Sequence, residues 1–197
     1  ALQQSDLQFD SPYSNYSLNL DGSGAYINTN FTIPAWTEYS ISLWFKYTGS
    51  GNPTNYKAVL GAGSSGGNTD NRAMIAFSGT KFYANMGTGT GAYWYDISSV
   101  SVTELFDGNW HHIALSVFET GQNLYIDGSL KYQYSYSNGS YLNPTTGFAG
   151  TSPYYINKFG SSGAGYLAQK IDELSFFDKK ITDSEVLQIY NNGKPSD

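Results

Sequence analysis

The chain of 197 residues contains no cysteine. This absence excludes a disulfide framework, a zinc site built on cysteines and a thiol nucleophile. A domain of this length buries enough apolar surface to fold without cross-links, so the missing cysteine assigns the protein to no compartment. The length suits one domain of the β-sandwich kind and argues against two complete domains.

Charged side chains are also scarce, because Asp, Glu, Lys and Arg together make up 13% of the chain. The usual share is ~25%, so long helices with charged, solvated faces are excluded. The net charge is −6 and the 10 basic residues form no cluster, so we expect no nucleic-acid partner. The sequence also lacks an apolar run of membrane-spanning length and a signal sequence at Ala1, so we expect no membrane insertion.

Aromatic residues are plentiful by contrast, at 17% of the chain, and 18 residues are tyrosines. Tyrosine combines an apolar ring with a polar tip and suits both β-strands and wet binding faces. The remaining surface must consist mainly of Ser, Thr, Asn, Gly and Tyr. Such a surface is typical of extracellular and virion β proteins, and we expect the protein to be extracellular, on a cell surface or on a virion.

The stretch 107–130 carries the strongest local signal. Residues 110–117 alternate between two faces, one of which is apolar, as in a half-buried strand that covers a core. Residues 39–47 alternate in the same way. Asp127 and Gly128 stand between β-forming residues and predict a type I′ hairpin turn, whose two central residues need positive φ.

Short strands and glycine-bearing turns continue through the rest of the chain, which is typical of an antiparallel sandwich. One helix is predicted near the end, where Thr182 and Glu185 form a capping box. We therefore expect an all-β fold of two antiparallel sheets with one short C-terminal helix. Residues 1–16 are predicted to form an N-terminal arm or edge segment, residues 17–193 a single domain and residues 194–197 a tail.

Four segments occur in an order that is found in a known family: Leu18–Ile27, Tyr39–Phe45, Asp107–Gly128 and Leu167–Phe176. The last two are the most specific, through Asp-Gly-Asn-Trp-His-His and Ile-Asp-Glu-Leu-Ser-Phe. Over about residues 17–192 the chain resembles the laminin G-like jelly roll of the concanavalin A-like lectin/glucanase superfamily. The resemblance implies two stacked sheets, one of them concave, with ligand contacts on the concave face or its rim loops.

The acidic residues argue against an enzyme. Glycosidases use two carboxyl groups about 5–9 Å apart, and related β-glucanases carry them as Glu-x-Asp-x-x-Glu, a motif that this chain lacks. Asp172 and Glu173 are neighbours on a predicted strand and point to opposite faces. A lyase acting on uronates needs basic side chains, and Arg72 is the only arginine. His111 and His112 diverge in the same way as the two acids, so we expect structural roles for them and no enzymatic activity.

Asp172 has a further interpretation that comes from the resemblance. In glucanases of this fold, an acidic residue on the last long strand helps to hold a structural Ca²⁺ together with backbone carbonyls, which implies calcium as a cofactor at Asp172. Asp21, in the first predicted turn, is the candidate for a second carboxylate, since Ca²⁺ takes six to eight oxygen ligands. The alternative is that Asp21 caps its own turn and Asp172 accepts backbone hydrogen bonds.

Two aromatic clusters are candidate ligand-binding platforms, because flat sugar faces stack on aromatic rings while polar tips reach the hydroxyl groups. The candidate residues are Tyr93, Trp94, Tyr95, Tyr132, Tyr134 and Tyr136. The last three share one face of a predicted strand, at a spacing of about 7 Å. The alternative is that these rings only cover a sheet face.

The sequence therefore favours a non-catalytic carbohydrate-binding or adhesion domain with a glycan or polysaccharide partner, displayed on an extracellular or virion surface. The Tyr-, Gly-, Asn- and Ser-rich composition is similar to that of bacterial surface proteins and phage structural proteins with this domain, so a larger surface or virion assembly is a second expected partner. One alternative is a structural or protein-interaction module whose concave face is closed. A further alternative is a degenerate polysaccharide hydrolase or lyase.

Overall fold

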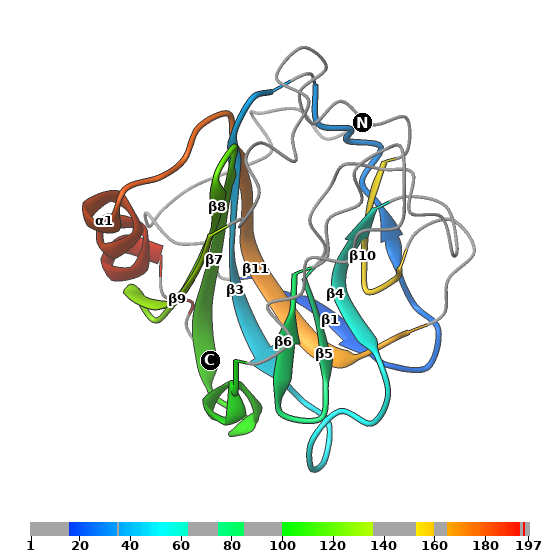
Figure 1. Cartoon of the computed structure of the whole chain (residues 1–197). Coiled ribbons are helices and arrows are strands. Elements are labelled where there is room, and N and C mark those ends of the chain that lie inside the picture. Colours follow the sequence, from blue (N-terminus) through cyan, green and yellow to red (C-terminus); the bar gives the residue numbers. More distant parts are fainter. Residues whose placement is uncertain are drawn as a thin grey trace.

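The computed structural model describes residues 16–34, 36–62, 75–84, 100–135, 153–159, 165–193 and 195, and their strands form two stacked antiparallel sheets (Figure 1). The six-stranded sheet has the order β1 (Leu18–Asp21), β11 (Ala168–Phe177), β3 (Tyr39–Tyr47), β7 (Trp110–Phe118), β8 (Gly121–Ile126) and β9 (Ser129–Ser135). The five-stranded sheet has the order β2 (Ile27–Asn28), β10 (Tyr154–Ile156), β4 (Lys57–Ala62), β5 (Ile75–Ser78) and β6 (Lys81–Tyr83). The predicted all-β sandwich is confirmed.

The main core lies between the two sheets and is built from alternate residues of the strands. Ile113, Leu115 and Val117 of β7 enter this core, and β3 contributes Ile41 and Leu43 in the same way. These residues are at most 1% exposed. The predicted alternation is therefore confirmed, because successive strand residues point to opposite faces.

One expectation about β7 was wrong, because the strand is not half-buried. Its other face, which includes His112, Ala114 and Ser116, is also buried. The helix α1 (Asp183–Gly193) lies on this outer side of the six-stranded sheet, away from the five-stranded sheet (Figure 1). The helix makes a small second core there, in which Val186 packs against Ala114.

The predicted capping box begins α1. The backbone N–H of Glu185 donates to Thr182 Oγ1 at 3.3 Å, and the backbone N–H of Thr182 donates to Glu185 Oε2 at 2.8 Å. Further along the helix, Tyr190 stacks on Trp44 of β3 with ring centroids 5.5 Å apart.

In the described part of the chain, no helix is long and apolar enough to cross a membrane. Of the predicted arm and tail, all but Tyr16 and Pro195 lie outside the described residues.

The predicted hairpin turn is present between β8 and β9, with φ of 49° at Asp127 and 76° at Gly128. The Asp127 carboxylate ties this turn to β7. Its Oδ2 lies 2.8 Å from His111 Nδ1, and its Oδ1 accepts a hydrogen bond of 2.9 Å from the backbone N–H of His112. The other ring nitrogen of His111 lies 3.0 Å from Asp107 Oδ1. One imidazole therefore joins the turn before β7 to the β8–β9 hairpin.

The two histidines have opposite electrostatic surroundings. Hydrogen bonds to Asp127 and Asp107 raise the pKa of His111, although partial burial acts against the shift. Burial lowers the pKa of His112 to about 4, since its ring is fully enclosed, with Nε2 2.8 Å from Ser42 Oγ. The adjacent rings point to opposite faces, as predicted, and their positions fit the expected structural roles.

Replacing each histidine by glutamine tests these opposite states. The stabilisation from His111 is fully present below about pH 6.5, its unfolded pKa, and is lost as the pH rises through its raised folded pKa. The stabilisation from neutral His112 is present above about pH 6.5 and is lost as the pH falls toward 4, by up to about 3 kcal/mol. The difference in Tm between wild type and His111→Gln should therefore shrink from about pH 5 to about pH 8. For His112→Gln this difference in Tm should grow over the same pH range. If both differences changed in the same direction with pH, these assignments would be contradicted.

Candidate functional site

The β8–β9 hairpin presents different side chains on its two faces. Tyr132 and Tyr134 lie on the inner face, as the predicted shared face requires, and both are half-buried against the main core. Asn123 and Tyr125 lie on the outer face, toward α1. Tyr136, the third member of the predicted ladder, lies outside the described residues. The ladder is thus a pair of rings anchored in the core at the edge strand of the sheet.

The other predicted aromatic cluster belongs to the segment between β6 and β7. Tyr93, Trp94 and Tyr95 all lie outside the described residues. Trp44 and Trp110, by contrast, are described and are 1% and 8% exposed. Both lie on the outer face of the six-stranded sheet rather than between the sheets.

The two predicted calcium ligands are not brought together. Asp21 pairs with Ala168 of β11, four residues before Asp172, so the two backbone positions are offset by about 13 Å along the strand at ~3.3 Å per residue. Asp21 binds within its own turn, where Ser23 donates hydrogen bonds to both carboxylate oxygens. One ion cannot contact both acids, and among the described residues no three His, Asp or Glu side chains form a metal-binding group. A site that uses Asp172 without Asp21 stays a prediction.

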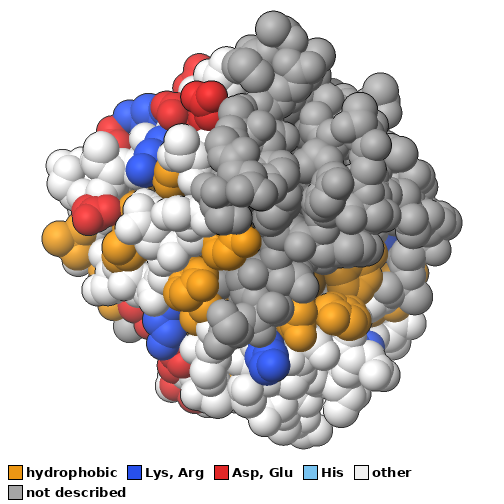
Figure 2. Space-filling model, in the orientation of Figure 1, with side chains coloured by type: hydrophobic (Ala, Val, Ile, Leu, Met, Phe, Trp, Pro, Cys, Tyr) orange, Lys and Arg blue, Asp and Glu red, His pale blue; other side chains and the backbone are white. Residues whose placement is uncertain are grey.

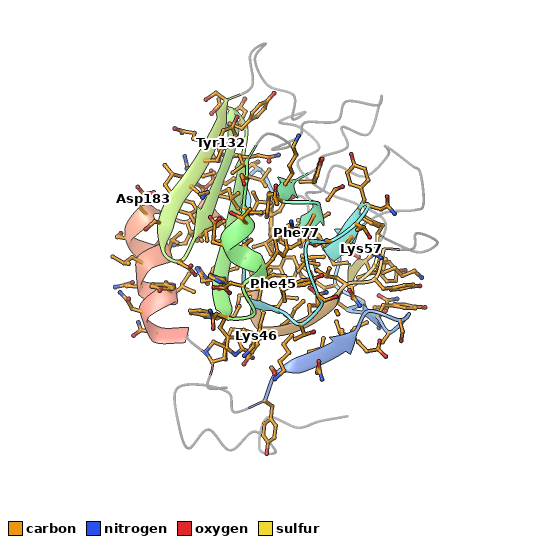
Figure 3. All side chains as sticks on the ribbon, turned by 90° about the horizontal axis from the view of Figure 1, so that it is seen from below. Phe45, Lys46, Lys57, Phe77, Tyr132 and Asp183 are labelled. Atoms are coloured by element: carbon orange, nitrogen blue, oxygen red, sulfur yellow. The ribbon has the colours of Figure 1, made fainter. Side chains whose placement is uncertain are left out.

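A pocket opens on the outer face of the six-stranded sheet, between β8 and the first turn of α1. Asn123 and Tyr125 line it from β8, and residues 180–184 line it from the helix side. Its volume of about 520 Å³ falls in the range of about 300–1,000 Å³ that is usual for small-molecule sites. Figure 3 shows Asp183 at the start of α1, on this outer side of the sheet. Asp183 is the only carboxylate among the lining residues, so the pocket itself offers no glycosidase pair.

Hydrogen bonds in the pocket determine how the Asn123 amide is oriented. The Tyr125 hydroxyl donates its one proton to Asp183 Oδ1 over 2.8 Å, and burial raises the pKa of Tyr125, which keeps that proton in place. The hydroxyl must then accept its second bond from Asn123 Nδ2, at 3.1 Å. This order leaves Asn123 Oδ1 as the free end of the amide.

Asn123 Oδ1 is buried and has no hydrogen-bond partner among the described residues, in a side chain that is 5% exposed. A buried acceptor without a partner costs about 1–3 kcal/mol. Six other buried side-chain polar atoms of the described residues also lack a partner, but Asn123 is the one residue of this group that lines the pocket.

Sequence analysis did not single out Asn123, Tyr125 or Asp183. One weak signal was available, because Asn123 and Tyr125 share the strand face opposite the apolar Leu124. The partner Asp183 was hidden within the predicted capping-box segment, 58 residues from Tyr125. Only the docking of α1 onto the sheet brings the three together.

The comparisons with known proteins concern the fold as a whole. A family model described as the concanavalin A-like lectin/glucanases superfamily matches residues 21–187. No curated protein matches the sequence. Among solved structures, the binding domain of Paraclostridial Mosquitocidal Protein 1 is similar with a TM-score of 0.62 and 17% identity, over 89% of this chain and 43% of that chain.

Two further solved structures share the fold. The binding domain of botulinum neurotoxin serotype D/C has a TM-score of 0.61 and 13% identity, over 89% of this chain and 43% of that chain. The Ruminococcus gnavus IT-sialidase CBM40, bound to α2,3-sialyllactose, has a TM-score of 0.60 and 13% identity, over 79% of this chain and 84% of that chain. The chain thus spans less than half of the toxin binding domains, and at these identities the similarity concerns the fold alone.

The family match extends over most of the chain and agrees with the two stacked antiparallel sheets and the single C-terminal helix. It also confirms the resemblance drawn from the four ordered segments. The chain belongs to the concanavalin A-like lectin/glucanases superfamily, as a laminin G-like member.

Proposed function

We propose that the domain binds a glycan without catalysing a reaction. The observation that carries the proposal is the pair of tyrosine rings on β9, each anchored in the main core with part of its surface exposed at the sheet edge. A ring held in this way stacks on an apolar sugar face with little loss of side-chain freedom. The proposal is supported by the fold, which is shared with toxin binding domains and with a CBM40 bound to sialyllactose.

A glycan array, followed by titration with the best ligand, tests the role of these rings. Tyr132→Ala and Tyr134→Ala should each weaken binding about 3- to 10-fold, because a stacked aromatic contact contributes about 0.5–1.5 kcal/mol. The corresponding phenylalanine variants keep the ring and should bind nearly as wild type does. Tyr56→Ala removes an exposed tyrosine that packs on Tyr83 of the other sheet and serves as the control. Unchanged affinity in both alanine variants would contradict the assignment of the site.

The alternative of a structural or protein-interaction module has one observation in its favour. On the outer face of the five-stranded sheet, Ala58, Ala76, Tyr83 and Tyr155 are at most 9% exposed, although they lie outside the main core. The outer face of the five-stranded sheet is therefore covered at these four positions. A domain that binds no glycan on the array would favour this second function.

The proposed setting is an extracellular, cell or virion surface, within a larger assembly. The low charge and the Tyr-, Gly-, Asn- and Ser-rich composition support this setting. On the left of the face shown in Figure 2, acidic and basic side chains of the described residues lie next to each other. Antibody labelling of intact cells or virions should detect the domain, and labelling only after lysis would contradict a surface location.

We also propose a structural calcium ion held by Asp172. Burial raises the pKa of this half-buried carboxyl, and a bound cation would offset the cost of keeping it charged. The remaining ligands would be backbone carbonyls and water, since Asp21 is too far away.

Thermal unfolding with Ca²⁺ and with a chelator tests this ion. At about 100 times its Kd, an ion that binds only the folded state adds about 2.7 kcal/mol, or roughly 5–10 °C in Tm for a domain of this size. The increase should disappear in Asp172→Asn and remain in Asp21→Asn. A Tm that does not respond to Ca²⁺ in the wild type would contradict the site.

A further inference from the structure

We infer that the pocket between β8 and the first turn of α1 is a second binding site, for a neutral ligand rich in hydroxyl groups such as a monosaccharide unit. The inference rests on the proposed function and names a site and a ligand class for it. The pocket lies on the face of the β8–β9 hairpin opposite to Tyr132 and Tyr134. The two sites can therefore be tested separately.

The polar groups of the pocket call for hydrogen-bond donors. Asn123 Oδ1 is an acceptor that lacks a partner among the described residues, in a side chain that is 95% buried. Asp183 adds carboxylate oxygens, which only accept. Ser184 adds a hydroxyl group that can donate and accept, 3.2 Å from Thr182 Oγ1, whereas the Thr182 hydroxyl is engaged with Glu185 in the capping box. A sugar ring supplies several hydroxyl donors and acceptors within the size of one such pocket, and so complements this set.

The charges around the pocket disfavour an acidic ligand. Asp183 is its one carboxylate, and it would repel a uronate, a sialate or a phosphate. Lys180 is its one cation, but the ammonium group lies 3.7 Å from the centre of the Phe118 ring, in a cation–π contact. An acidic ligand would have to draw Lys180 away from this contact, whereas a neutral ligand needs no such rearrangement.

The walls of the pocket are held in place before any ligand binds. Ile181 and Tyr125 are each 1% exposed and belong to the small core under α1. Ser40 fixes the segment before the helix, because its Oγ accepts a bond of 3.0 Å from the N–H of Ile181 and donates one of 2.8 Å to the carbonyl of Lys179. A site preorganised in this way loses little entropy when it orders a small ligand.

NMR titration of the full chain with neutral and acidic sugars tests the inference. Methyl glucoside, methyl galactoside and N-acetylglucosamine serve as neutral probes, and glucuronate and galacturonate as acidic ones. A neutral probe should shift the side-chain amide signals of Asn123 and the backbone signals of residues 180–184. Its affinity should exceed that of the acidic probes by about tenfold, which corresponds to ~1.4 kcal/mol.

Three variants, whose Tm is measured alongside, identify the contacts. Asn123→Leu has a similar volume without the amide and should weaken neutral-sugar binding about tenfold. Asp183→Asn keeps the capping residue Thr182 and should weaken neutral-sugar binding. In this variant the affinity for the acidic probes should come closer to the affinity for the neutral probes. Gln133→Ala is the control, since this exposed residue of β9 pairs with Asn123 of β8 but does not line the pocket.

The possible results separate this inference from the proposed function. Glycan binding that persists unchanged in both Asn123→Leu and Asp183→Asn would overturn the pocket as a site and leave the proposed function standing. Acidic sugars that bind as tightly as neutral ones, or a simple amine such as ethanolamine that binds in place of sugars, would overturn the ligand class. A wild-type chain that binds nothing on the array or among the probes would overturn both.

Discussion

The pairing of β8 with β9, which depends on the type I′ turn at Asp127 and Gly128 and on a register shift beside Leu124, is the constraint on which both proposed glycan sites depend. The turn pairs Ile126 with Ser129 and Tyr125 with Leu130, and a one-residue register shift then pairs Leu124 with Tyr132. Because a one-residue shift exchanges the two faces of a strand, this irregularity places Tyr132 and Tyr134 on the inner face. The bond between Asp127 and His111 anchors the turn to the centre of the sheet. With the register fixed, the β9 tyrosines pack against the main core while Asn123 and Tyr125 face the helix.

The helix α1 changes the nature of the outer sheet face. Without it, Trp44, Ala114 and Tyr125 would form an apolar strip in contact with water on the outer side of the six-stranded sheet. The capping box starts the helix where its first turn meets β8, and the stack of Tyr190 on Trp44 holds its other end. Because the first turn of a helix carries polar groups, the meeting point becomes a pocket with hydroxyl and carboxylate groups rather than a sealed apolar contact.

Membership of the concanavalin A-like superfamily describes the architecture and leaves the chemistry to particular side chains. Four acidic residues of the described part of the chain stabilise turns, a helix cap and a contact with histidine. Asp21 and Asp107 close Asx-type turns, Asp127 binds His111, and Glu185 caps α1. These four carboxylates therefore have structural roles.

The sequence by itself determined the features that depend on neighbours within a few residues. The hairpin turn at Asp127, the capping box at Thr182 and the strand alternation are of this kind, because backbone conformation and side-chain period act locally. Only the tertiary structure decided that β7 is buried on both faces, that Asp21 and Asp172 lie far apart, and that Tyr125 meets Asp183. Each of these features depends on how segments distant in sequence pack or pair. Tyr125 and Asp183, for example, are separated by 58 positions in the sequence. No local pattern encodes such a separation, because it arises from the packing of the helix on the sheet.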